Sequence, residues 1–350
     1  MSESRLVAER ATEPHTDALA GERVTAVVCT YRGTAFLEEQ VRSIQEQTRP
    51  PAEILVTDDG SGDGTVPLAV EVLAAGTVPY RVYTRDSPLG IAGNAFFGLQ
   101  HARTPLVAFA DQDDRWHPDK LERLVPLLAD DASAWLAHSD AALVDEHGSP
   151  LGEGLFDSLE PSAREWRDYT GPEPWRQLLR RNFVTGATML VRREPALAAG
   201  RAPAPWIHDE WLAVAAALHG AIRVTRAPLI DYRQHGANQI GQRRLGLGEK
   251  IARITGPGAA RQQRKTQRAA ALAGRVRALG ASAEQETFVR RKAAFERARA
   301  ALPAARPLRV AHVARRALAG QYETFARGLG DVARDLLQSH TDAATEPATD

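Results

Sequence analysis

The sequence is poor in cysteine, methionine and aromatic residues, with one Cys, two Met and 6% aromatic residues in a chain of 350. A lone Cys29 excludes a disulfide within the chain, which is typical of a reducing compartment. No apolar run approaches the roughly 20 residues of a membrane-spanning helix, and the N-terminal segment lacks the apolar core of a secretory signal. We therefore expect a cytoplasmic protein, free or peripheral on the inner face of the membrane.

The formal net charge is zero, but the charges are distributed unevenly. The first 240 residues hold 23 Lys/Arg and 34 Asp/Glu, whereas residues 241–350 hold 21 Lys/Arg and 10 Asp/Glu. Such a division indicates two parts with different partners. With 43% hydrophobic residues, the chain is long enough for one large core and an additional smaller region.

Short apolar runs alternate with segments of helical spacing from residue 24 onward. The pattern predicts strands at 24–31, 53–59, 80–86 and 105–111. It predicts helices at 34–48, 65–76 and 91–102 and after His117. Because the strands are almost continuously apolar, we expect a mostly parallel sheet that helices cover on both faces.

The alternation is less regular after residue 130. We expect two strands around a turn at His147-Gly148, a strand within 183–193, a helix at 208–220 and a strand at 221–236. The expected domains are a disordered arm at 1–22, an α/β domain at 23–245 with halves at 23–115 and 116–245, a basic Ala/Arg-rich helical region at 246–340, and a disordered tail at 341–350.

Polar segments follow three of the predicted strands. The first strand runs into "CTYRG", the second into the glycine-rich "DDGSGDGT", and the fourth into "DQDD". A glycine-rich turn is weak evidence alone, since Gly, Asp and Ser are common in turns. Ligands of open α/β sheets bind beyond the carboxyl ends of the strands, so three such segments at one edge indicate a binding site there.

The stretch "LVAFADQDDRWHP" places three carboxylates directly after an apolar strand: Asp111, Asp113 and Asp114. An isolated Asp-x-Asp is often only a solvated turn, but here the preceding strand directs the cluster into a cleft. Carboxylates that leave coordination positions open suit Mg²⁺ or Mn²⁺ bound together with the phosphates of a substrate. We therefore expect a divalent cation that carries a diphosphate.

Taken in order, the motifs "CTYRG", "DDGSGDGT", "GIAGNAFFGLQHA", "FADQDDRWHPDKLERL", "IHDEWLAVAAALHG" and "LIDYRQHGANQIG" resemble family 2 glycosyltransferases over about residues 23–245. The closest resemblance is to the bacterial branch with rhamnosyltransferases of surface polysaccharide assembly. It implies an α/β GT-A fold, with a Rossmann-like mixed sheet and here a C-terminal helical extension. It also implies metal-dependent, inverting transfer of a hexose or deoxyhexose from a UDP- or dTDP-sugar to a surface polysaccharide or lipid-linked glycan.

The resemblance also implies roles for individual residues. The residues that it implies for donor nucleotide binding are Thr30, Tyr31, Arg32, Asp58, Asp59, Asn94, Asp111 and Gln112, with either Asp58 or Asp59 beside the ribose. The metal falls to Asp113, Asp111 and His235, and the catalytic base to Asp209. The acceptor or the diphosphate falls to Asp114, Trp116, His208, Glu210 and Arg233. On a helix, neighbouring side chains point about 100° apart, so only one of Asp209 and Glu210 faces the cleft.

Some of these residues also have ordinary structural interpretations. His208 and His235 could be satisfied polar residues at element ends, Trp116 a packing residue, and Asn94 part of a polar helix face. Pro88-Leu89 stands where the family commonly has Asn before Gly90, which removes one expected side-chain contact with the donor.

Two rival functions and one further partner follow from the same sequence. A sugar nucleotidyltransferase would need a Gly-rich basic loop after the first strand, and "CTYRGTAFLEEQ" has one Arg and one Gly there. An inactive carbohydrate-binding or scaffold protein would lack the carboxylates that are present here.

The 17 Lys/Arg and 4 Asp/Glu of residues 251–330 are either a solvated face or an attachment to anionic lipid. Sparse aromatic residues argue against nucleic acid.

Overall fold

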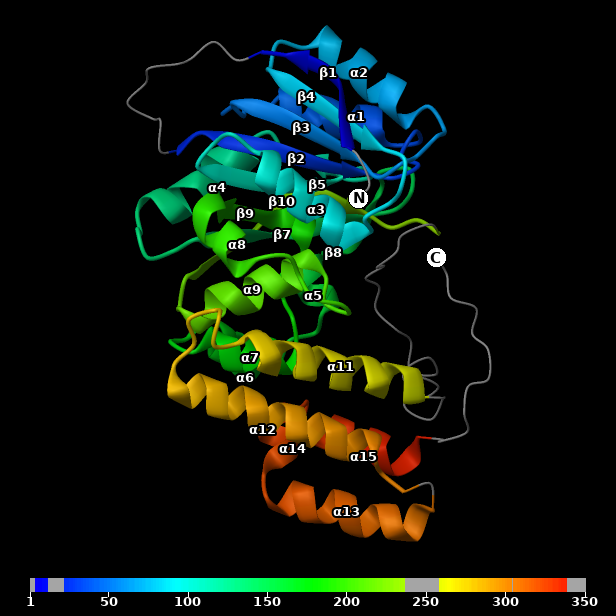
Figure 1. The fold of residues 1–350 in the computed structure, drawn as a ribbon, viewed down its shortest axis with the longest axis vertical. Coiled ribbons are helices and arrows are strands. Elements are labelled where there is room, and N and C mark those ends of the chain that lie inside the picture. Colours follow the sequence, from blue (N-terminus) through cyan, green and yellow to red (C-terminus); the bar gives the residue numbers. More distant parts are fainter. Residues whose placement is uncertain (1–3, 12–21, 237–257, 304, 339–350) are drawn as a thin grey trace. The chain divides into compact units, whose positions relative to one another are not determined.

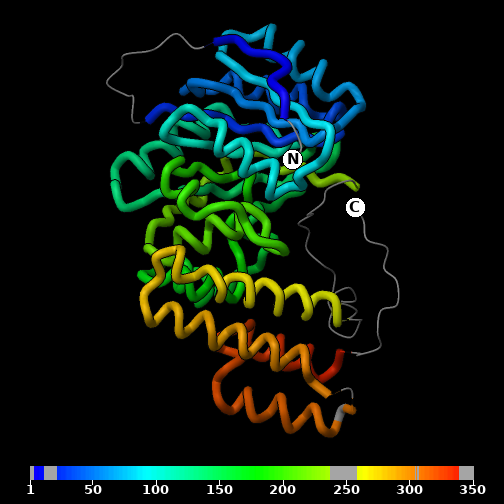
Figure 2. Tube along the Cα trace, viewed as in Figure 1, coloured from blue at the N-terminus to red at the C-terminus, as the bar shows by residue number. Residues whose placement is uncertain are grey.

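The computed structural model describes residues 4–11, 22–236, 258–303 and 305–338, and these form two compact units. The sheet unit comprises Met1–Trp175, Phe183–Ala202 and Trp206–Gln242, and the helical unit Arg176–Asn182, Pro203–Pro205 and Arg243–Asp350. Figures 1 and 2 follow the chain through the two units in sequence colours. The expected tail at 341–350 lies outside the described residues.

A ten-stranded mixed sheet forms the first unit, in the order β1-β4-β3-β2-β5-β9-β7-β10-β6, with β8 beside β7. The strands are β1 (Ser4–Arg10), β2 (Val24–Thr30), β3 (Glu53–Asp58), β4 (Tyr80–Arg85), β5 (Leu106–Asp111), β6 (Arg115–Trp116), β7 (Leu136–Val144), β8 (Pro150–Gly154), β9 (Met189–Arg192) and β10 (Ile222–Arg233). The four strands β4, β3, β2 and β5 are parallel, as the apolar runs predicted.

The second half of the sheet mixes both directions. β9 is antiparallel to β5 and to β7, whereas β10 is parallel to β7. The expectation of a disordered arm at 1–22 was wrong for Ser4–Arg10, which form β1 along the edge strand β4. This short strand alternates charged and apolar residues, so its sequence alone resembles a solvated arm.

Helices cover both faces of the sheet (Figure 1). In the sheet unit they are α1 (Leu37–Gln45), α2 (Thr65–Ala75), α3 (Ile91–His101), α4 (Lys120–Ala129), α5 (Leu155–Ser158), α6 (Ala163–Thr170), α8 (Arg193–Ala199) and α9 (His208–Leu218), with a 3₁₀ turn η2 (Gly186–Thr188). Alternate residues of β2 divide between the faces: Ala26 and Val28 join the core under α1, α2 and α4. Val27 meets α3, where a Cβ on Gly98 would lie 2.3 Å from Val27 Cγ1, so α3 packs close to the sheet.

The helical unit contains α11 (Ala259–Arg275), α12 (Ala283–Ala300), α13 (Arg306–Leu318), α14 (Gln321–Phe325) and α15 (Leu329–Leu337), and α7 (Pro174–Arg180) enters it. Ser282 begins α12 with a capping box, because its side chain accepts from the N–H of Gln285 while the Gln285 side chain accepts from the N–H of Ser282. In the part of the chain that the structure describes, none of the helices has the length and apolar character needed to cross a membrane.

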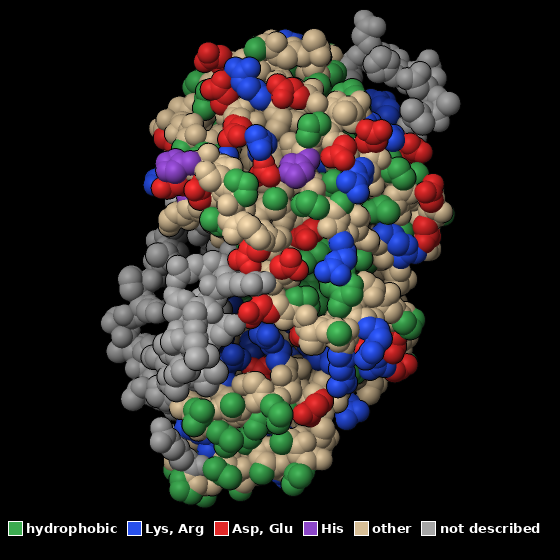
Figure 3. Space-filling model, turned by 180° about the vertical axis from the view of Figure 1, so that it is seen from behind, with side chains coloured by type: hydrophobic (Ala, Val, Ile, Leu, Met, Phe, Trp, Pro, Cys, Tyr) green, Lys and Arg blue, Asp and Glu red, His purple; other side chains and the backbone are tan. Residues whose placement is uncertain are grey.

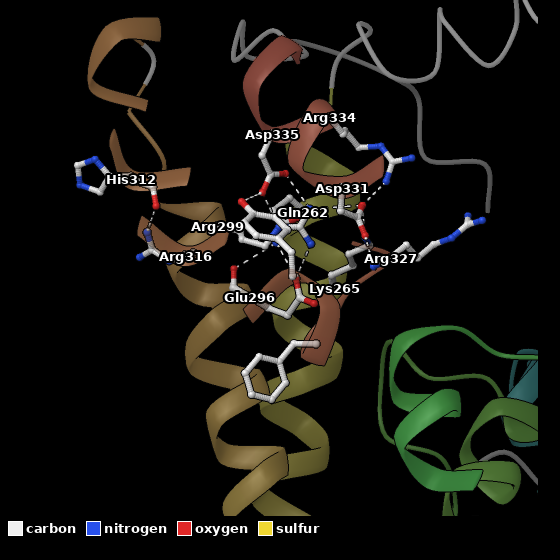
Figure 4. A network of polar contacts seen from close by, with 12 residues as sticks. Gln262, Lys265, Glu296, Arg299, His312, Arg316, Arg327, Asp331, Arg334 and Asp335 are labelled. Carbon is white, nitrogen blue, oxygen red and sulfur yellow. Dashed lines mark hydrogen bonds and ion pairs between the residues drawn. The ribbon is translucent and has the colours of Figure 1, made fainter. Parts of the chain in front are cut away.

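Buried ion pairs, rather than only apolar side chains, join the helices of this unit (Figure 4). Arg299 of α12 is 1% exposed and donates to both carboxylate oxygens of Asp335 in α15, at 2.6 and 2.7 Å. Glu296 and Asp331 lie beside the same guanidinium, and the Tyr322 hydroxyl donates to Asp335 at 2.7 Å. The network therefore fixes α12, α14 and α15 against one another.

Replacing Arg299 by Ala leaves three buried carboxylates short of a cation, and removing one partner of a buried pair typically costs about 3–5 kcal/mol. We expect the unfolding transition of the helical unit, followed by circular dichroism in urea, to shift to lower urea by a corresponding amount. Arg297→Ala is the control, because Arg297 lies two residues before Arg299 and is exposed. This change should leave the unfolding transition in place. Equal midpoints for the two variants would contradict a stabilising role for the network.

Candidate active site

The carboxyl ends of three neighbouring parallel strands meet at one edge of the sheet. In the register, Thr30 of β2 lies opposite Asp58 of β3, and Cys29 of β2 opposite Asp111 of β5. The polar segments after these strands are therefore neighbours in space, as the sequence predicted. The last residues of β10 reach the same edge, because Arg233 donates to the acidic segment that follows β5.

Asp58 shapes the glycine-rich turn after β3. It is fully buried, and its two oxygens accept from the N–H groups of Gly60 and Ser61 at 3.1 and 3.0 Å and from the hydroxyls of Thr30 and Thr84 at 3.0 and 2.9 Å. The Ser61 hydroxyl donates to it as well. With both oxygens used in this way, Asp58 and Thr30 hold the shape of the edge from inside the protein.

Asp59 and Asn94 belong to a second buried network. Asp59 pairs with Arg85 at 2.6 Å and accepts from the N–H of Gly90 at 2.9 Å. The same Arg85 nitrogen donates to the Asn94 side chain at 2.7 Å, and Asn94 donates to the carbonyl of Thr57 at 2.7 Å. This network joins the ends of β3 and β4 to the start of α3.

The outer rim of the edge carries Tyr31, Arg32 and Gln112. The Gln112 side chain accepts from the N–H of Tyr31 at 2.8 Å and donates to its carbonyl at 3.0 Å, so it joins the ends of β2 and β5. A Cβ on Gly33 would lie 2.3 Å from Gln112 Oε1, so a larger residue here would displace the Gln112 side chain from its contact with Tyr31. The Tyr31 ring is 38% exposed and lies 5.2 Å from the Arg32 guanidinium, which leaves both side chains available to a ligand.

Asp111, Asp113 and Asp114 form a cluster of like charges after β5, which we call the acidic loop. Burial and the charges of Asp113 and Asp209 raise the pKa of Asp111 to about 7. Burial, Asp113 and Asp111 raise the pKa of Asp114 well above its usual range. Asp114 is 1% exposed, and its Oδ2 has no hydrogen-bond partner among the described residues. The loop therefore holds more negative charge than its surroundings neutralise.

Arg233 and His235, at the end of β10, fix the acidic loop in place. The backbone N–H of Arg233 donates to Asp114 at 3.1 Å, and its guanidinium donates to the carbonyl of Asp113 at 2.9 Å and to Glu39. His235 Nε2 lies 2.9 Å from Asp113 Oδ2, and its ring packs on Phe36. Arg233 and His235 therefore both contact the acidic loop, and their predicted contacts with a metal or a diphosphate stay predictions.

Asp209 lies in the first turn of α9 and is 8% exposed. Its oxygens accept from the backbone N–H groups of Gly186 at 3.1 Å and Glu210 at 2.6 Å. Because its charge raises the pKa of Asp111, the two carboxylates act on each other directly. Of the pair Asp209 and Glu210, the structure brings Asp209 to the acidic loop.

Of the residues predicted to contact the acceptor, Trp116 is buried and His208 is half-buried. Trp116 is 2% exposed, and the Lys120 ammonium lies 3.8 Å from the centre of its ring. Burial lowers the pKa of His208 to about 4, and its ring packs on Phe109. In this conformation Trp116 contacts Lys120 and His208 contacts Phe109. The predicted contacts of both side chains with an acceptor remain predictions.

Lys120 and Tyr232 were not among the predicted residues. Lys120 is fully buried, donates to the carbonyl of Ala187 at 2.6 Å, and burial lowers its pKa to about 7 against the opposing effects of Asp114 and Asp111. Helical spacing places Lys120 on the apolar stripe with Leu124 and Leu128, and this was the sequence signal for a buried lysine.

The Tyr232 phenol, on β10, lies among the same carboxylates. Burial and the charges of Asp114, Asp111, Asp113 and Asp209 all raise its pKa. A tyrosine inside an apolar strand is usually read as packing, so no sequence signal separated it from the other aromatic residues.

The acidic loop suits a divalent cation that a substrate helps to bind. No group of three or more His, Cys, Asp or Glu side chains in the described residues is arranged to hold a metal alone. Mg²⁺ and similar ions are commonly held by one or two carboxylates and the phosphates of a substrate. The unpartnered Asp114 oxygen and the repulsion around Asp111 are compatible with such an ion, and that Asp113 and Asp111 would be its protein ligands stays a prediction.

An α/β sheet with a carboxylate cluster after its central strand and a second carboxylate on a facing helix defines the GT-A class of fold. Solved structures agree: the mannosyltransferase PcManGT from Pyrobaculum calidifontis matches with a TM-score of 0.50 and 20% identity over 85% of this chain and 76% of that one. S. aureus TarS 1-349 matches with a TM-score of 0.50 and 15% identity over 89% of each chain.

Residues 25–197 match the model of glycosyl transferase family 2. The putative teichuronic acid biosynthesis glycosyltransferase TuaG of Bacillus subtilis is 29% identical over 129 residues, 37% of this chain and half of that protein. The dTDP-rhamnosyl transferase RfbG of Shigella flexneri is 25% identical over 241 residues, 63% of this chain and 78% of that protein. The predicted family and enzyme class are thereby confirmed.

The raised pKa of Asp111 gives cation binding a defined pH dependence. Below about pH 7 this carboxyl holds a proton in the metal-free chain and must lose it to bind a cation, so protons compete with the metal. We expect the affinity for Mn²⁺, measured from the electron paramagnetic resonance signal of the free ion, to fall by up to about tenfold per pH unit below 7. Asp111→Asn should flatten this dependence, and Asp119→Asn, at a carboxylate of the same segment whose side chain is 43% exposed, should retain it. Equal Mn²⁺ affinity at pH 6 and pH 8 in the unmodified chain would contradict this view of Asp111.

Lys120 connects the acidic loop to the turn that holds Asp209. Its bond to Ala187 fixes η2, whose Gly186 N–H holds Asp209. In Lys120→Met this bond is lost while the side-chain volume is nearly retained. We expect kcat for sugar transfer to fall about a hundredfold, the scale of losing one oriented polar contact, with a much smaller change in the KM for the donor, whose predicted rim lies elsewhere.

Arg123→Ala, one turn further along α4 and exposed, is the control for Lys120→Met. If Lys120→Met lost folded protein in proportion to its loss of activity, or raised the donor KM with unchanged kcat, Lys120 would not position Asp209.

Proposed function

We propose that this protein is a metal-dependent, inverting glycosyltransferase that takes a hexose or deoxyhexose from a UDP- or dTDP-sugar. The observation that carries the proposal is the convergence of the acidic loop with Asp209, a buried carboxylate held by two backbone N–H groups. The relative RfbG, a dTDP-rhamnosyl transferase, makes a deoxyhexose donor one specific candidate. The acceptor in this proposal is a surface polysaccharide or a lipid-linked glycan. The protein would act at the inner face of the membrane.

Inversion requires one displacement at the anomeric carbon. The acceptor oxygen forms a bond to that carbon, the bond from the carbon to the diphosphate oxygen breaks, and the nucleoside diphosphate leaves. The proton of the acceptor hydroxyl passes to the Asp209 carboxylate, which acts as general base. Taking up this proton also relieves the repulsion between Asp209 and Asp111.

Two backbone N–H bonds give Asp209 a fixed orientation. Gly186 and Glu210 hold its oxygens from the loop side and from the helix, so the remaining lone pairs point in a set direction. A Cβ on Gly186 would lie 2.7 Å from His208 Nε2, so glycine is required for this approach. The base is therefore positioned before the acceptor binds, which lowers the entropic part of the barrier.

The donor half of the proposal uses the outer rim and the acidic loop. Tyr31 and Arg32 present an aromatic ring and a cation at the end of β2, where a base and a ribose can stack and hydrogen-bond. Asp113 and Asp111 would hold Mn²⁺ or Mg²⁺, which offsets the charge that develops on the departing diphosphate. Arg233 and His235 keep the loop in position for this.

The proposal is tested by release of nucleoside diphosphate from UDP-glucose, UDP-galactose, UDP-N-acetylglucosamine, dTDP-rhamnose and GDP-mannose, with and without Mn²⁺. We expect release from one donor, dependent on the metal. Asp113→Asn should lose the metal-dependent part. Asp209→Asn should lower kcat by about a hundredfold or more while calorimetry still detects donor binding.

Asp119→Asn serves again as the control, because its partly exposed carboxylate lies on the same segment without a place in the proposed site. Donor binding without any turnover, including with added glycan acceptors, would support an inactive carbohydrate-binding or scaffold protein. Consumption of a sugar phosphate and a nucleoside triphosphate would support a nucleotidyltransferase. Either result would overturn the proposal.

A further inference from the structure

Exposed apolar side chains are concentrated in the helical unit. Ten large hydrophobic side chains are exposed in the described residues, and five of them lie between 308 and 337. These five are Leu308 (61% exposed), Val310 (52%), Leu318 (91%), Leu329 (78%) and Leu337 (50%). An apolar concentration of this kind, outside a core, marks a surface that another partner covers.

Three of the five lie on one helix, α13. Arg309 and Val313 point into the helical unit and are 2% and 1% exposed. At about 100° per residue, the residues on the opposite side of α13 form a continuous small and apolar surface. This surface, which we call the α13 face, consists of Pro307, Val310, Ala311, Ala314 and Leu318, all exposed, and the exposed Leu308 lies just beyond Arg315 on the same side of the helix. Figure 3 shows hydrophobic side chains gathered at the foot of the view, where Figure 1 places α13.

The charges around the α13 face are of one sign. Arg306–Leu318 contain no Asp or Glu, and the exposed His312 and Arg315 border the face. In the described part of the helical unit the exposed acidic residues are Glu284 and Glu323. The exposed basic residues there are Arg264, Arg275, Arg277, Arg290, Arg291, Arg297, Arg315 and Arg327. Most of the other acidic side chains are buried against cations, as Glu296, Asp331 and Asp335 are in Figure 4.

The α13 face is held in its outward orientation. Arg309, on the inner side of α13, donates to the carbonyls of Pro303 at 2.9 Å and Gln338 at 2.7 Å. Both bonds are largely buried, so rotation of the helix about its axis would break them and bury Leu318 at the expense of Arg309. The outward position of the apolar residues is therefore built into the unit.

We propose that the α13 face lies on the surface of an anionic phospholipid bilayer. A helix with one apolar face and basic residues at its border inserts that face among the acyl chains at the boundary with the headgroups, while its arginines contact the phosphates. The helix is roughly 20 Å long at 1.5 Å per residue, so the whole face can engage one leaflet. This proposal does not depend on the identity of the donor or acceptor.

A second copy of the chain fits the α13 face less well. A symmetric pair would bring two copies of the same surface together, each bordered by His312 and Arg315 and surrounded by further arginines. Like charges at close range oppose such a pair, whereas anionic headgroups neutralise them. Charge complementarity therefore favours the lipid.

The test is sedimentation of the full chain with vesicles of phosphatidylglycerol and with vesicles of phosphatidylcholine. We expect binding to phosphatidylglycerol that weakens with salt, and much weaker binding to phosphatidylcholine. Leu318→Asp should lower the partition coefficient by about tenfold or more, because a charge replaces the most exposed apolar side chain of the face. Leu151→Asp, at an exposed leucine of β8, is the matched control and should bind as the unmodified chain does.

Arg315→Glu should weaken binding to phosphatidylglycerol, and Arg123→Glu, at an exposed arginine of α4, should leave it almost unchanged. Circular dichroism confirms that each variant is folded. If Leu318→Asp and Leu151→Asp lost vesicle binding equally, or if the unmodified chain bound both lipids equally, the proposal would be overturned. A dimer in sedimentation velocity that Leu318→Asp abolishes, without vesicle binding, would assign the face to a second copy instead. Nucleoside diphosphate release is measured separately, so failure here is distinct from failure of the proposed function.

Discussion

The site depends on the repulsion among the carboxylates that follow β5. Asp111, Asp113 and Asp114 are held together by covalent connection, and Asp209 reaches them from α9, so four carboxyl groups share one edge of the sheet. Unbalanced charges in a partly buried region cost free energy unless a proton, a fixed cation or a bound ion neutralises them. Lys120 adds a basic group beside them, although burial lowers its own pKa to about 7. The raised pKa of Asp111 reflects its burial first and then the charges of Asp113 and Asp209.

The surrounding structure is arranged to withstand this repulsion. Arg233 holds the acidic loop by its backbone and its side chain, Gln112 joins the ends of β2 and β5, and Gly186 fixes Asp209. These contacts come from elements distant in the sequence, so the site forms only when the sheet is complete. In the proposed function, a site prepared in this way would bind a cation and its diphosphate with little reorganisation, which is the arrangement that favours charge stabilisation during transfer.

The sequence predicted the parts of this arrangement that follow from periodicity and strand ends. The apolar runs gave the parallel strands β2 to β5 almost to the residue, and the segments after them meet as expected. It could not separate residues that line the cleft from those that support it. Asp58, Asn94 and Trp116 have side-chain types that suit a ligand, yet their described partners are other residues of the protein. Lys120 was overlooked because a single lysine near a helix start is usually solvated.

The central claim is that the acidic loop binds a divalent cation together with a nucleoside diphosphate. The most direct measurement is anomalous diffraction from crystals grown with MnCl₂ and UDP. The account predicts a manganese peak roughly 2.1 Å from a carboxylate oxygen of Asp113 or Asp111, with the diphosphate on its open side. A nucleotide bound at this edge with no manganese beside these carboxylates, or manganese at another place in the chain, would contradict it.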